Sequence, residues 1–592
     1  MSLRPDNPLI VQSDRSLMLH TVRAVVDGRG HPVKDASGSP LTEEHPRFAA
    51  ARDALSCFAE LEKSPDYLHT YRITPVSIWN AAALGVGADE IGGVLEEFSC
   101  VPVPRTVLAD VRDWIARYGL FKIERRGDGA AERFELVSSS ADALADVLGH
   151  GDIRKLVEVD RAGAVWVNPL SRGSIKQALI KIGFPVDDRG GYLDGDPLEV
   201  RLREVARSGA PFRLRGYQVG AAEAFHAGGS VLGGSGVIVL PCGAGKTVVG
   251  LKVMNLVGSK TLILTTNTVA VRQWREELLD KTALGEDQVG EYTGDSKRVC
   301  PVTITTYQML TWRRARTDPF EHFGLFSREN WGLVIYDEVH LLPAPIFRVT
   351  ADLQARRRLG LTATLVREDG KEDEVFCLIG PKRYDVPWKV LEGQGFIAAA
   401  TCTEVRVPLD AAWRPAYTSA SARGKFRVAS ENPAKTRVVE RLIERHRGGR
   451  ILVIGQYIDQ LHALARHLRA PLITGKTPNA DREKLYAAFR SGELEVLIVS
   501  KVGNFAVDLP EASVAIQISG TFGSRQEEAQ RLGRILRPKP DGSAASFYSV
   551  VTLGSRDQEF AEKRQLFLTE QGYAYEIVEA GQILDGQGEP AR

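Results

Sequence analysis

Short apolar runs of four or five residues recur through the middle of the chain, and segments with helical spacing follow them. The predicted strands are residues 237–240, 261–265, 302–305 and 333–336. Runs of this length that are rich in β-branched residues are typical of strands buried on both faces of a sheet. Strands that alternate with helices indicate parallel pairing, because a parallel connection needs a crossover of about helix length. This part of the chain is therefore predicted to be an α/β sheet.

The same alternation returns in the C-terminal part, from about residue 435 to about residue 576. The predicted strands there are residues 451–454, 496–499, 514–518 and 547–551. A chain of 592 residues is long enough for several domains, since a domain usually has about 150 residues. We therefore expect two α/β sections in one chain.

The first 205 residues follow a different pattern, in which short helices precede a hairpin. Thr74 and Pro75 are typical of an N-cap and a first helical position. The predicted elements are helices over 76–84, 88–98 and 105–118 and strands over 121–124 and 133–137. Such an arrangement is typical of a winged-helix-like module, which binds DNA or protein, and both readings stay open.

The composition narrows the range of partners and cofactors. The formal net charge is only +1, so a surface for nucleic acid has to come from local clusters. The arginines at 313, 314 and 316 and those at 356–358 are such clusters, and solvated helix surfaces explain them equally well. The six cysteines include no Cys-x-x-Cys pair, so we expect no zinc site, iron–sulfur cluster or disulfide framework. Without an apolar signal core or a membrane-length apolar run, we expect a cytoplasmic protein.

Residues 240–247 read Leu-Pro-Cys-Gly-Ala-Gly-Lys-Thr and stand between a predicted strand and a predicted helix. Gly243, Ala244 and Gly245 would let backbone N–H groups close around phosphates at the positive end of the helix dipole. Lys246, expected as an exposed ligand group, would reach the β- and γ-phosphates, and the Thr247 hydroxyl would bind Mg²⁺. A leucine replaces the first glycine of the full pattern, and an ordinary strand-to-helix turn is the alternative. This phosphate cradle predicts ATP and Mg²⁺ as cofactors.

Asp337 and Glu338 directly follow the apolar run 333–336. Acidic residues at the carboxyl end of a strand are expected in a parallel sheet that already carries a phosphate cradle. Asp337 would hold Mg²⁺ through water, and Glu338 would polarise the attacking water as the general base. A solvated loop after the strand is the alternative.

Two further segments point to the same nucleotide. Gln218, close to Arg215, precedes the cradle and would read an adenine edge, or it belongs to a helix N-cap region. Near the C-terminus, a helix would carry Arg531, Arg534 and Arg537 on one broad face. Arginines that reach the γ-phosphate from a second lobe stabilise transition-state charge, whereas a solvated basic helix is the alternative.

The motifs Gly-Ala-Gly-Lys-Thr, Asp-Glu-Val-His, Thr-Ala-Thr and Gln-Arg-Leu-Gly-Arg-Ile-Leu-Arg occur in this order. The ordered set resembles the superfamily 2 helicases and translocases, in which two RecA-like lobes clamp ATP. Arg-Glu-Asp at 367–369 and Gly-Pro-Lys-Arg-Tyr-Asp-Val-Pro-Trp at 380–388 are similar to the XPB family, in its short, bacterial-type form. The resemblance is strong over about residues 205–580 and weaker over about 66–200. The chain departs from the eukaryotic members, which carry longer termini for their transcription factor IIH partners.

The resemblance implies roles for further residues. Beside Glu338, it implies Gln530, Arg534 and Arg537 as catalytic residues, and it implies Asp508 as an ATP contact. The residues implied to bind DNA, or to couple DNA to the nucleotide, are Arg272, Thr305, His340, Thr362, Thr364, Arg367, Glu368 and Asp369.

Pattern and resemblance together predict an α/β protein with two RecA-like lobes, built of parallel sheets flanked by helices, and a smaller N-terminal α+β region. The expected divisions are an N-terminal winged-helix-like region (1–137), a small damage-recognition-like accessory unit (138–205), lobe 1 with the ATP site (206–395), a junction with a thumb-like insertion near 408–433 (396–434), and lobe 2 (435–592).

The resemblance also implies an ATP-dependent 3′-to-5′ DNA helicase or translocase that opens or remodels duplex DNA, in DNA repair. The expected partner is DNA, as single strands and duplex junctions, which would bring the protein to the nucleoid; a partner nuclease is left open. One alternative is a translocase that moves along duplex DNA without separating its strands. Another is an ATP-gated DNA-binding scaffold with little turnover.

Overall fold

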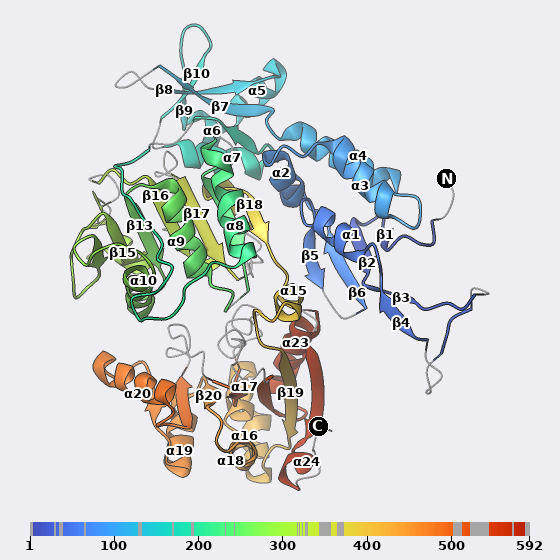
Figure 1. Cartoon of the computed structure of the whole chain (residues 1–592), viewed down its shortest axis with the longest axis vertical. Helices are drawn as coiled ribbons and strands as arrows, with labels where there is room; N and C mark the ends of the chain where they lie inside the picture. The colour runs from blue at the N-terminus through green and yellow to red at the C-terminus, as the bar shows by residue number, and fades with distance from the viewer. Residues whose placement is uncertain are drawn as a thin grey trace. The chain divides into compact units, whose positions relative to one another are not determined.

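The described part of the chain forms two compact units (Figure 1). The computed structural model describes residues 4–28, 31–34, 40–63, 67–127, 133–168, 171–190, 194–230, 233–241, 243–315, 318, 320–322, 324–325, 329–341, 357–363, 372–500, 512–520, 544–570 and 573–585. Unit 1 comprises Met1–Leu240 with Gly245–Asp385, and unit 2 comprises Pro241–Ala244 with Val386–Arg592. Among the described helices, none has both the length and the apolar character that a membrane crossing requires.

The N-terminal part of unit 1 is an antiparallel sheet covered by helices. Its strand order is β1-β2-β6-β5. The elements are β1 (Leu9–Val11), β2 (Ser16–His20), β3 (Val22–Ala24), β4 (Thr42–Glu44), α1 (Phe48–Leu55), β5 (Glu60–Lys63), β6 (Leu68–Arg72), α2 (Pro75–Ala83), α3 (Ala88–Phe98) and α4 (Arg105–Arg117). Thr74 caps α2 as predicted, because its hydroxyl accepts the N–H of Ser77 at 3.0 Å. Leu17, Ile78 and Leu95 are fully buried in the shared apolar core.

The next sheet corrects the predicted boundary at residue 137. It has five strands in the order β11-β7-β8-β10-β9. The elements are β7 (Phe121–Arg126), β8 (Arg133–Ser138), α5 (Ala141–Gly149), α6 (Gly151–Arg154), β9 (Val157–Val159), β10 (Val165–Val167), α7 (Arg172–Lys181) and β11 (Val186–Asp188). The predicted hairpin of β7 and β8 is confirmed, but β10 pairs with β8, and β11 pairs in parallel with β7. The hairpin therefore belongs to the accessory sheet rather than to the helices that precede it.

Unit 1 also contains a seven-stranded sheet, and every neighbouring pair in it is parallel. Its order is β14-β15-β13-β16-β17-β12-β18. The strands are β12 (Ser235–Val239), β13 (Thr261–Thr265), β14 (Val289–Tyr292), β15 (Val302–Thr306), β16 (Leu333–Asp337), β17 (Arg357–Thr362) and β18 (Lys382–Asp385). The helices are α8 (Gly216–His226), α9 (Lys246–Val257), α10 (Thr268–Lys281), α11 (Tyr307–Leu310) and α14 (Glu372–Leu378). Helices α8 and α9 lie side by side across one face of the sheet (Figure 1).

Unit 2 contains a second seven-stranded parallel sheet, in the order β21-β22-β20-β23-β24-β19-β25. Its strands are β19 (Ala400–Val407), β20 (Ile451–Gly455), β21 (Leu472–Ile473), β22 (Val496–Ser500), β23 (Val514–Gln517), β24 (Ala545–Thr552) and β25 (Ala574–Glu579). Its helices are α15 (Trp388–Gly393), α16 (Arg414–Ser419), α17 (Ala422–Ser430), α18 (Lys435–Arg445), α19 (Ile458–Leu468), α20 (Asn479–Ser491), α23 (Arg556–Glu570) and α24 (Ala580–Leu584).

The predicted start of lobe 2 at residue 435 is therefore wrong. Strand β19 pairs in parallel with both β24 and β25, so it lies inside the sheet although it was assigned to the junction. The segment predicted as a thumb-like insertion, 408–433, contains α16 and α17, and α17 packs against α23 of unit 2. The predicted fold class is confirmed: the chain has two parallel α/β sheets and a smaller N-terminal region with antiparallel sheets.

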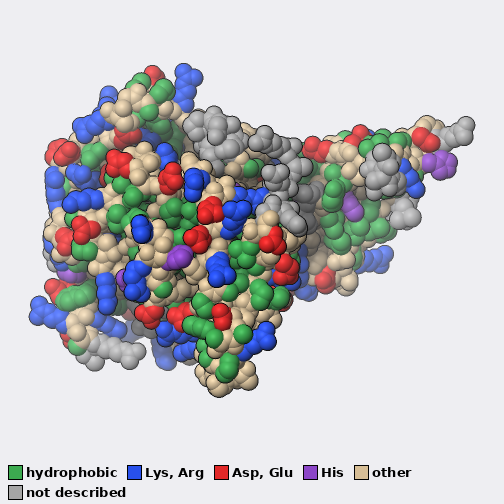
Figure 2. Space-filling view, turned by 90° about the horizontal axis from the view of Figure 1, so that it is seen from below, with side chains coloured by type: hydrophobic (Ala, Val, Ile, Leu, Met, Phe, Trp, Pro, Cys, Tyr) green, Lys and Arg blue, Asp and Glu red, His purple; other side chains and the backbone are tan. Residues whose placement is uncertain are grey.

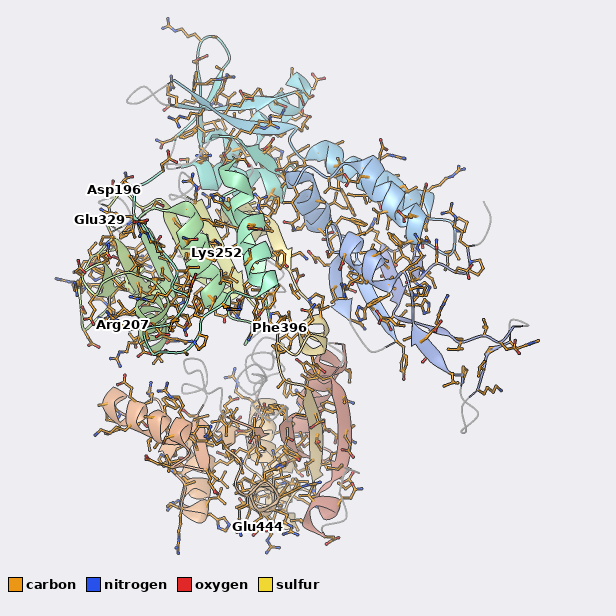
Figure 3. All side chains as sticks on the ribbon, in the orientation of Figure 1. Asp196, Arg207, Lys252, Glu329, Phe396 and Glu444 are labelled. Atoms are coloured by element: carbon orange, nitrogen blue, oxygen red, sulfur yellow. The ribbon has the colours of Figure 1, made fainter. Side chains whose placement is uncertain are left out.

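The N-terminal elements of unit 1 are bound to its seven-stranded sheet. Trp79 of α2 and Ile180 of α7 belong to the same apolar core cluster as Val237 and Leu262 of that sheet. Ion pairs hold the segment around Asp196, which leads from the accessory sheet to α8. Lys260 Nζ lies 2.7 Å from Asp196 Oδ2 and 3.3 Å from Glu329 Oε2. Figure 3 shows Asp196 and Glu329 close together at the edge of unit 1. These contacts make the N-terminal part and the parallel sheet one folded unit.

A buried cluster of charges marks the same junction. Asp188, at the end of β11, accepts hydrogen bonds from Arg172 and Lys176 of α7. Burial alone would raise the pKa of Asp188, but the charges of Arg172 and Lys176 hold that pKa well below its usual range. Arg358 of β17 contributes in the same direction and is 2% exposed, with Nη2 donating to Ser235 Oγ. The expectation that this arginine run is solvated or faces phosphates is therefore wrong for Arg358.

The surface carries no single dominant charge on the face shown in Figure 2. Lys and Arg side chains are interspersed there with Asp and Glu side chains. This distribution agrees with the formal net charge of +1. Recognition of a polyanion therefore has to rely on particular basic positions rather than on the overall field.

Candidate active site

The phosphate cradle follows β12 and opens helix α9. Gly243 and Gly245 have φ angles of 81° and 79°, in the left-handed region that favours glycine. Gly245 is the N-cap of α9, and a Cβ at this position would lie 2.6 Å from Nε2 of Gln218. The turn therefore leaves its backbone N–H groups at a helix N-terminus with no side chain over Gly245, as a bound phosphate requires.

Lys246 is the first residue of α9, and Thr247 is half-buried in the same turn. Nζ of Lys246 lies 3.7 Å from Oε1 of Glu338, and the Lys246 side chain is only 12% exposed. The expectation of an exposed lysine is wrong, because the side chain lies along the sheet edge beside the acidic pair. The two predicted motifs, which are far apart in the sequence, thus come together.

The acidic pair lies at the carboxyl end of β16. Asp337 is the last residue of that strand, and Glu338 has a φ angle of 50°. A non-glycine residue in the left-handed region is strained, and such residues cluster at functional sites. This backbone conformation turns Glu338 away from the strand direction and toward Lys246.

Asp337 is held by several neighbours. Nε1 of Trp274 donates to its Oδ2 at 2.9 Å, the N–H of Glu338 donates to its Oδ1 at 3.1 Å, and Oη of Tyr307 donates to its backbone carbonyl at 2.7 Å. Burial and the charge of Glu338 raise the pKa of Asp337 to about 6, while the Trp274 hydrogen bond and the charge of Lys246 oppose that rise. A cation beside this carboxylate would favour its ionised form.

The Glu338 carboxylate has one oxygen without a hydrogen bond. Oε2 is buried and accepts no hydrogen bond, and it lies 3.5 Å from Nδ1 of His340. A buried acceptor of this kind is costly unless a ligand or water completes it. His340 Nδ1 also lies 2.6 Å from Oγ1 of Thr362, so β16 and β17 are linked through these side chains.

The donors present fit Mg²⁺. A carboxylate from Asp337 and a hydroxyl from Thr247 are oxygen ligands of the type that Mg²⁺ prefers, with water and phosphate completing the shell. The unmatched Oε2 of Glu338 agrees with a water molecule beside a bound nucleotide. Among the described residues, no group of three or more His, Cys, Asp or Glu residues is arranged to hold a metal ion.

Gln218 and Arg215 lie next to the cradle. Oε1 of Gln218 accepts the backbone N–H of Arg215 at 3.0 Å, which is the N-cap alternative considered for this segment. Gln218 is 4% exposed, and its Nε2 is the atom that a Cβ on Gly245 would meet. Arg215 is half-buried, and its Nη1 donates to Oη of Tyr217 at 3.1 Å. An adenine contact by Gln218 stays a prediction.

The residues predicted to couple DNA to the nucleotide fall into two groups. Arg272 is half-buried on α10. Thr305 is fully buried and donates to the carbonyl of Tyr292, and His340 and Thr362 are buried as well. Buried side chains are poor candidates for direct DNA contact, so for these three residues the coupling role is the one that the geometry favours.

Several predicted site residues lie outside the described residues. They are Thr364, Arg367, Glu368, Asp369, Asp508, Gln530, Arg534 and Arg537, together with Arg531. Their roles stay predictions, from helical spacing for the three arginines of 531–537 and from the resemblance for the others.

Two residues at the site had no predicted role. Trp274 and Tyr307 both bind Asp337, one at the carboxylate and the other at the backbone carbonyl. Trp274 stands two positions after Arg272 in α10 and is buried. A polar indole N–H on an otherwise apolar helix face was the available signal, since buried indoles usually find an acceptor.

Known protein families match three segments of the chain. The model described as ERCC3/RAD25/XPB C-terminal helicase matches residues 391–589, the helicase conserved C-terminal domain matches residues 36–162, and the res subunit of type III restriction enzyme matches residues 211–367.

Similar proteins cover almost the whole chain. The DNA 3′-5′ helicase XPB of Kineococcus radiotolerans is 51% identical over 584 residues, which are 98% of each chain. The protein of the same name from Mycobacterium tuberculosis is 48% identical over 581 residues, which are 98% of this chain and 99% of that one. The general transcription and DNA repair factor IIH helicase/translocase subunit XPB/SSL2 of Saccharomyces cerevisiae is 31% identical, over 92% of this chain and 70% of its own length.

Proposed function

The chain belongs to the XPB family of ATP-hydrolysing DNA helicases, and from this premise we propose that it moves 3′-to-5′ along DNA and opens or remodels duplexes during DNA repair. The observation that carries the proposal is the meeting of Lys246 with Glu338 at 3.7 Å, beside Asp337 and the glycine turn. Polarity and the repair setting rest on the names of the relatives.

In this proposal the chain's own residues bind ATP and activate water. Backbone N–H groups of the cradle and Lys246 would bind the phosphates, and Thr247 and Asp337 would hold Mg²⁺. When bound, Mg²⁺ would neutralise charge on the phosphate oxygens. Water would attack the γ-phosphorus, its proton would pass to Glu338 Oε2, and the bond from the γ-phosphorus to the oxygen of ADP would break. Supporting this role, Oε2 is the buried acceptor that lacks a hydrogen bond.

The link from hydrolysis to DNA would run along β16 and β17. His340 lies between Glu338 and Thr362, with Nδ1 at 3.5 Å from Oε2 and 2.6 Å from Oγ1. A change at Glu338 during turnover would therefore reach Thr362, which is the last residue of β17 and the first of the Thr-Ala-Thr motif. The residues expected to continue this path, Arg367 and Asp369, are assigned by the resemblance alone. Arg534 and Arg537 are assigned to the γ-phosphate by their helical spacing and by the resemblance.

The test is ATP hydrolysis by the full chain with and without DNA, beside two displacement assays. A strand-displacement substrate with a 3′ overhang reports unwinding, a 5′ overhang reports polarity, and a triplex reports movement along duplex DNA. We expect DNA to stimulate hydrolysis and the strand of the 3′-overhang substrate to be displaced. We expect Glu338→Gln to hydrolyse ATP about 10²–10⁴-fold more slowly and to displace no strand.

The same measurements separate the alternatives. Triplex displacement without strand displacement would establish a duplex translocase instead. Nucleotide-dependent DNA binding with negligible hydrolysis would establish a scaffold and refute the assignment of Glu338 as the base.

A further inference from the structure

Trp274 lies where α10, α9 and the carboxyl end of β16 meet. It is 2% exposed, and its Nε1 donates to Oδ2 of Asp337 at 2.9 Å. The other carboxylate oxygen, Oδ1, accepts the N–H of Glu338 at 3.1 Å. Each oxygen of the Asp337 carboxylate thus has its own donor, and two donors on different oxygens fix the plane of the group.

The position of the indole is fixed from the other side by a glycine of the cradle helix. Gly250 lies one turn after Lys246 in α9, and a Cβ there would meet Cη2 of Trp274 at 2.6 Å. A glycine inside a helix costs about 0.5–1 kcal/mol relative to alanine, so its place needs a reason. The close contact with the Trp274 ring explains the glycine, because a side chain at position 250 would occupy the space that the indole fills.

We infer that Trp274 is a positioning residue for the metal site: wedged against Gly250, it holds the Asp337 carboxylate in the orientation that binds Mg²⁺ together with the nucleotide. This inference rests on the proposed role of Asp337 as a Mg²⁺ ligand. Hydrogen-bonding partners of metal ligands orient those ligands and raise metal affinity, and their loss commonly weakens binding about 10- to 100-fold. The indole also ties the metal ligand to the helix that carries Lys246.

The test measures the gain in ADP affinity that Mg²⁺ provides, rather than catalysis. A fluorescent ADP derivative is titrated into the full chain with Mg²⁺ and again with EDTA. Trp274→Phe keeps most of the ring and removes the N–H. We expect it to reduce the Mg²⁺-dependent gain about 10- to 100-fold and to leave the affinity in EDTA unchanged.

Trp331→Phe is the matched control. Trp331 is fully buried in the same unit, and its Nε1 donates to the carbonyl of Leu325 at 3.0 Å, away from the site. The control removes an equivalent indole hydrogen bond and should retain the whole Mg²⁺-dependent gain. Equal loss of ADP affinity in Mg²⁺ and in EDTA for Trp274→Phe would make Trp274 a packing residue and overturn the inference, as would a fully retained gain.

Two more variants complete the test. Gly250→Ala tests the inference if Trp274→Phe does not fold, and Asp337→Asn tests the premise that Asp337 binds Mg²⁺. Gly250→Ala keeps the indole but pushes it, and we expect the same selective loss of the Mg²⁺-dependent gain; a fully retained gain in this variant counts against the inference. Asp337→Asn should abolish most of the gain. A retained gain in Asp337→Asn overturns the metal assignment and the inference together, whereas loss in Asp337→Asn with retention in Trp274→Phe overturns the inference alone.

Discussion

The two parallel sheets share one strand order and differ in what lies at their carboxyl ends. Counted from the first strand of each, both run third, fourth, second, fifth, sixth, first, seventh. In both, a lysine opens the helix that leads into the second strand: Lys246 opens α9 before β13, and Lys435 opens α18 before β20. The same topology thus places the same residue type at the same point of two sheets.

The surroundings of the two lysines are opposite in character. Lys435 is 2% exposed at its side chain, and its Nζ lies 2.6 Å from Oδ2 of Asp557 and 2.9 Å from the carbonyl of Ile518. Lys246 retains 12% exposure and stands 3.7 Å from Glu338, beside a turn of glycines. Unit 2 has an internal ion pair where unit 1 has an incomplete site, so strand order alone does not make a nucleotide site.

Lys246→Ala should have the largest effect, because Lys246 is the cation proposed to bind the phosphates, whereas Lys435 is paired with Asp557. We expect ATP hydrolysis to fall to background in a steady-state assay with DNA, while circular dichroism and the unfolding of unit 2 stay unchanged. Turnover close to that of the unsubstituted protein would show that the two lysines are equivalent structural residues.

Glu338→Gln should rank second. The amide keeps the shape and loses the base, and removal of a general base commonly costs about 10²–10⁴ in rate. We expect the variant to bind ATP with Mg²⁺ and to hydrolyse it slowly in single-turnover measurements. Near-normal turnover would instead identify Glu338 as a structural partner of Lys246, comparable to Asp557 of unit 2.

Lys435→Met tests the other half of the comparison. It leaves Asp557 buried without its cation, and breaking a buried pair in this way typically costs about 3–5 kcal/mol. We expect a lower unfolding temperature for unit 2 in calorimetry of the full chain, with the affinity of Mg²⁺-ADP unchanged. The double variant Lys435→Met with Asp557→Asn should recover part of the loss; a nucleotide-binding defect with normal stability would contradict the proposed structural role.

The sequence predicted the central strands of both sheets well. The bounds of β13 were predicted without error, and those of β16 within one residue, because continuous apolar runs report burial on both faces. The phosphate cradle and the acidic pair were placed correctly at the ends of their strands, since parallel strands bring their carboxyl ends to one edge.

Two of the strands that were missed, β17 and β19, carry polar residues whose partners come from elsewhere in the fold. Strand β17 begins with Arg357 and Arg358, and the burial of Arg358 depends on a charge cluster around Asp188 that is distant in the sequence. Strand β19 carries a fully buried Glu404, which accepts hydrogen bonds from Arg406 and Tyr575. Similarly, the positive φ of Glu338 and the indole on Asp337 are set by tertiary packing, which local patterns do not encode.

The smallest expected effect concerns the buried charge cluster around Asp188 in unit 1. This cluster is the counterpart in unit 1 of the buried Lys435–Asp557 pair in unit 2. Because Arg172 and Lys176 hold the pKa of Asp188 well below its usual range, the Asp188 carboxylate of the native protein stays ionised under mildly acidic conditions. The unfolded chain takes up a proton near pH 3.9, so the stabilisation is fully present well above that pH and declines as the pH falls through it toward the native pKa. For this one group the loss relative to pH 7 is only a fraction of a kcal/mol at pH 4 and on the order of 1 kcal/mol at pH 3. Urea unfolding of unit 1 at these pH values, compared with Asp188→Asn, should show the stability gap between the two proteins narrowing by these amounts. A gap that stays constant or widens with acid would mean that Asp188 is not held ionised by its two partners.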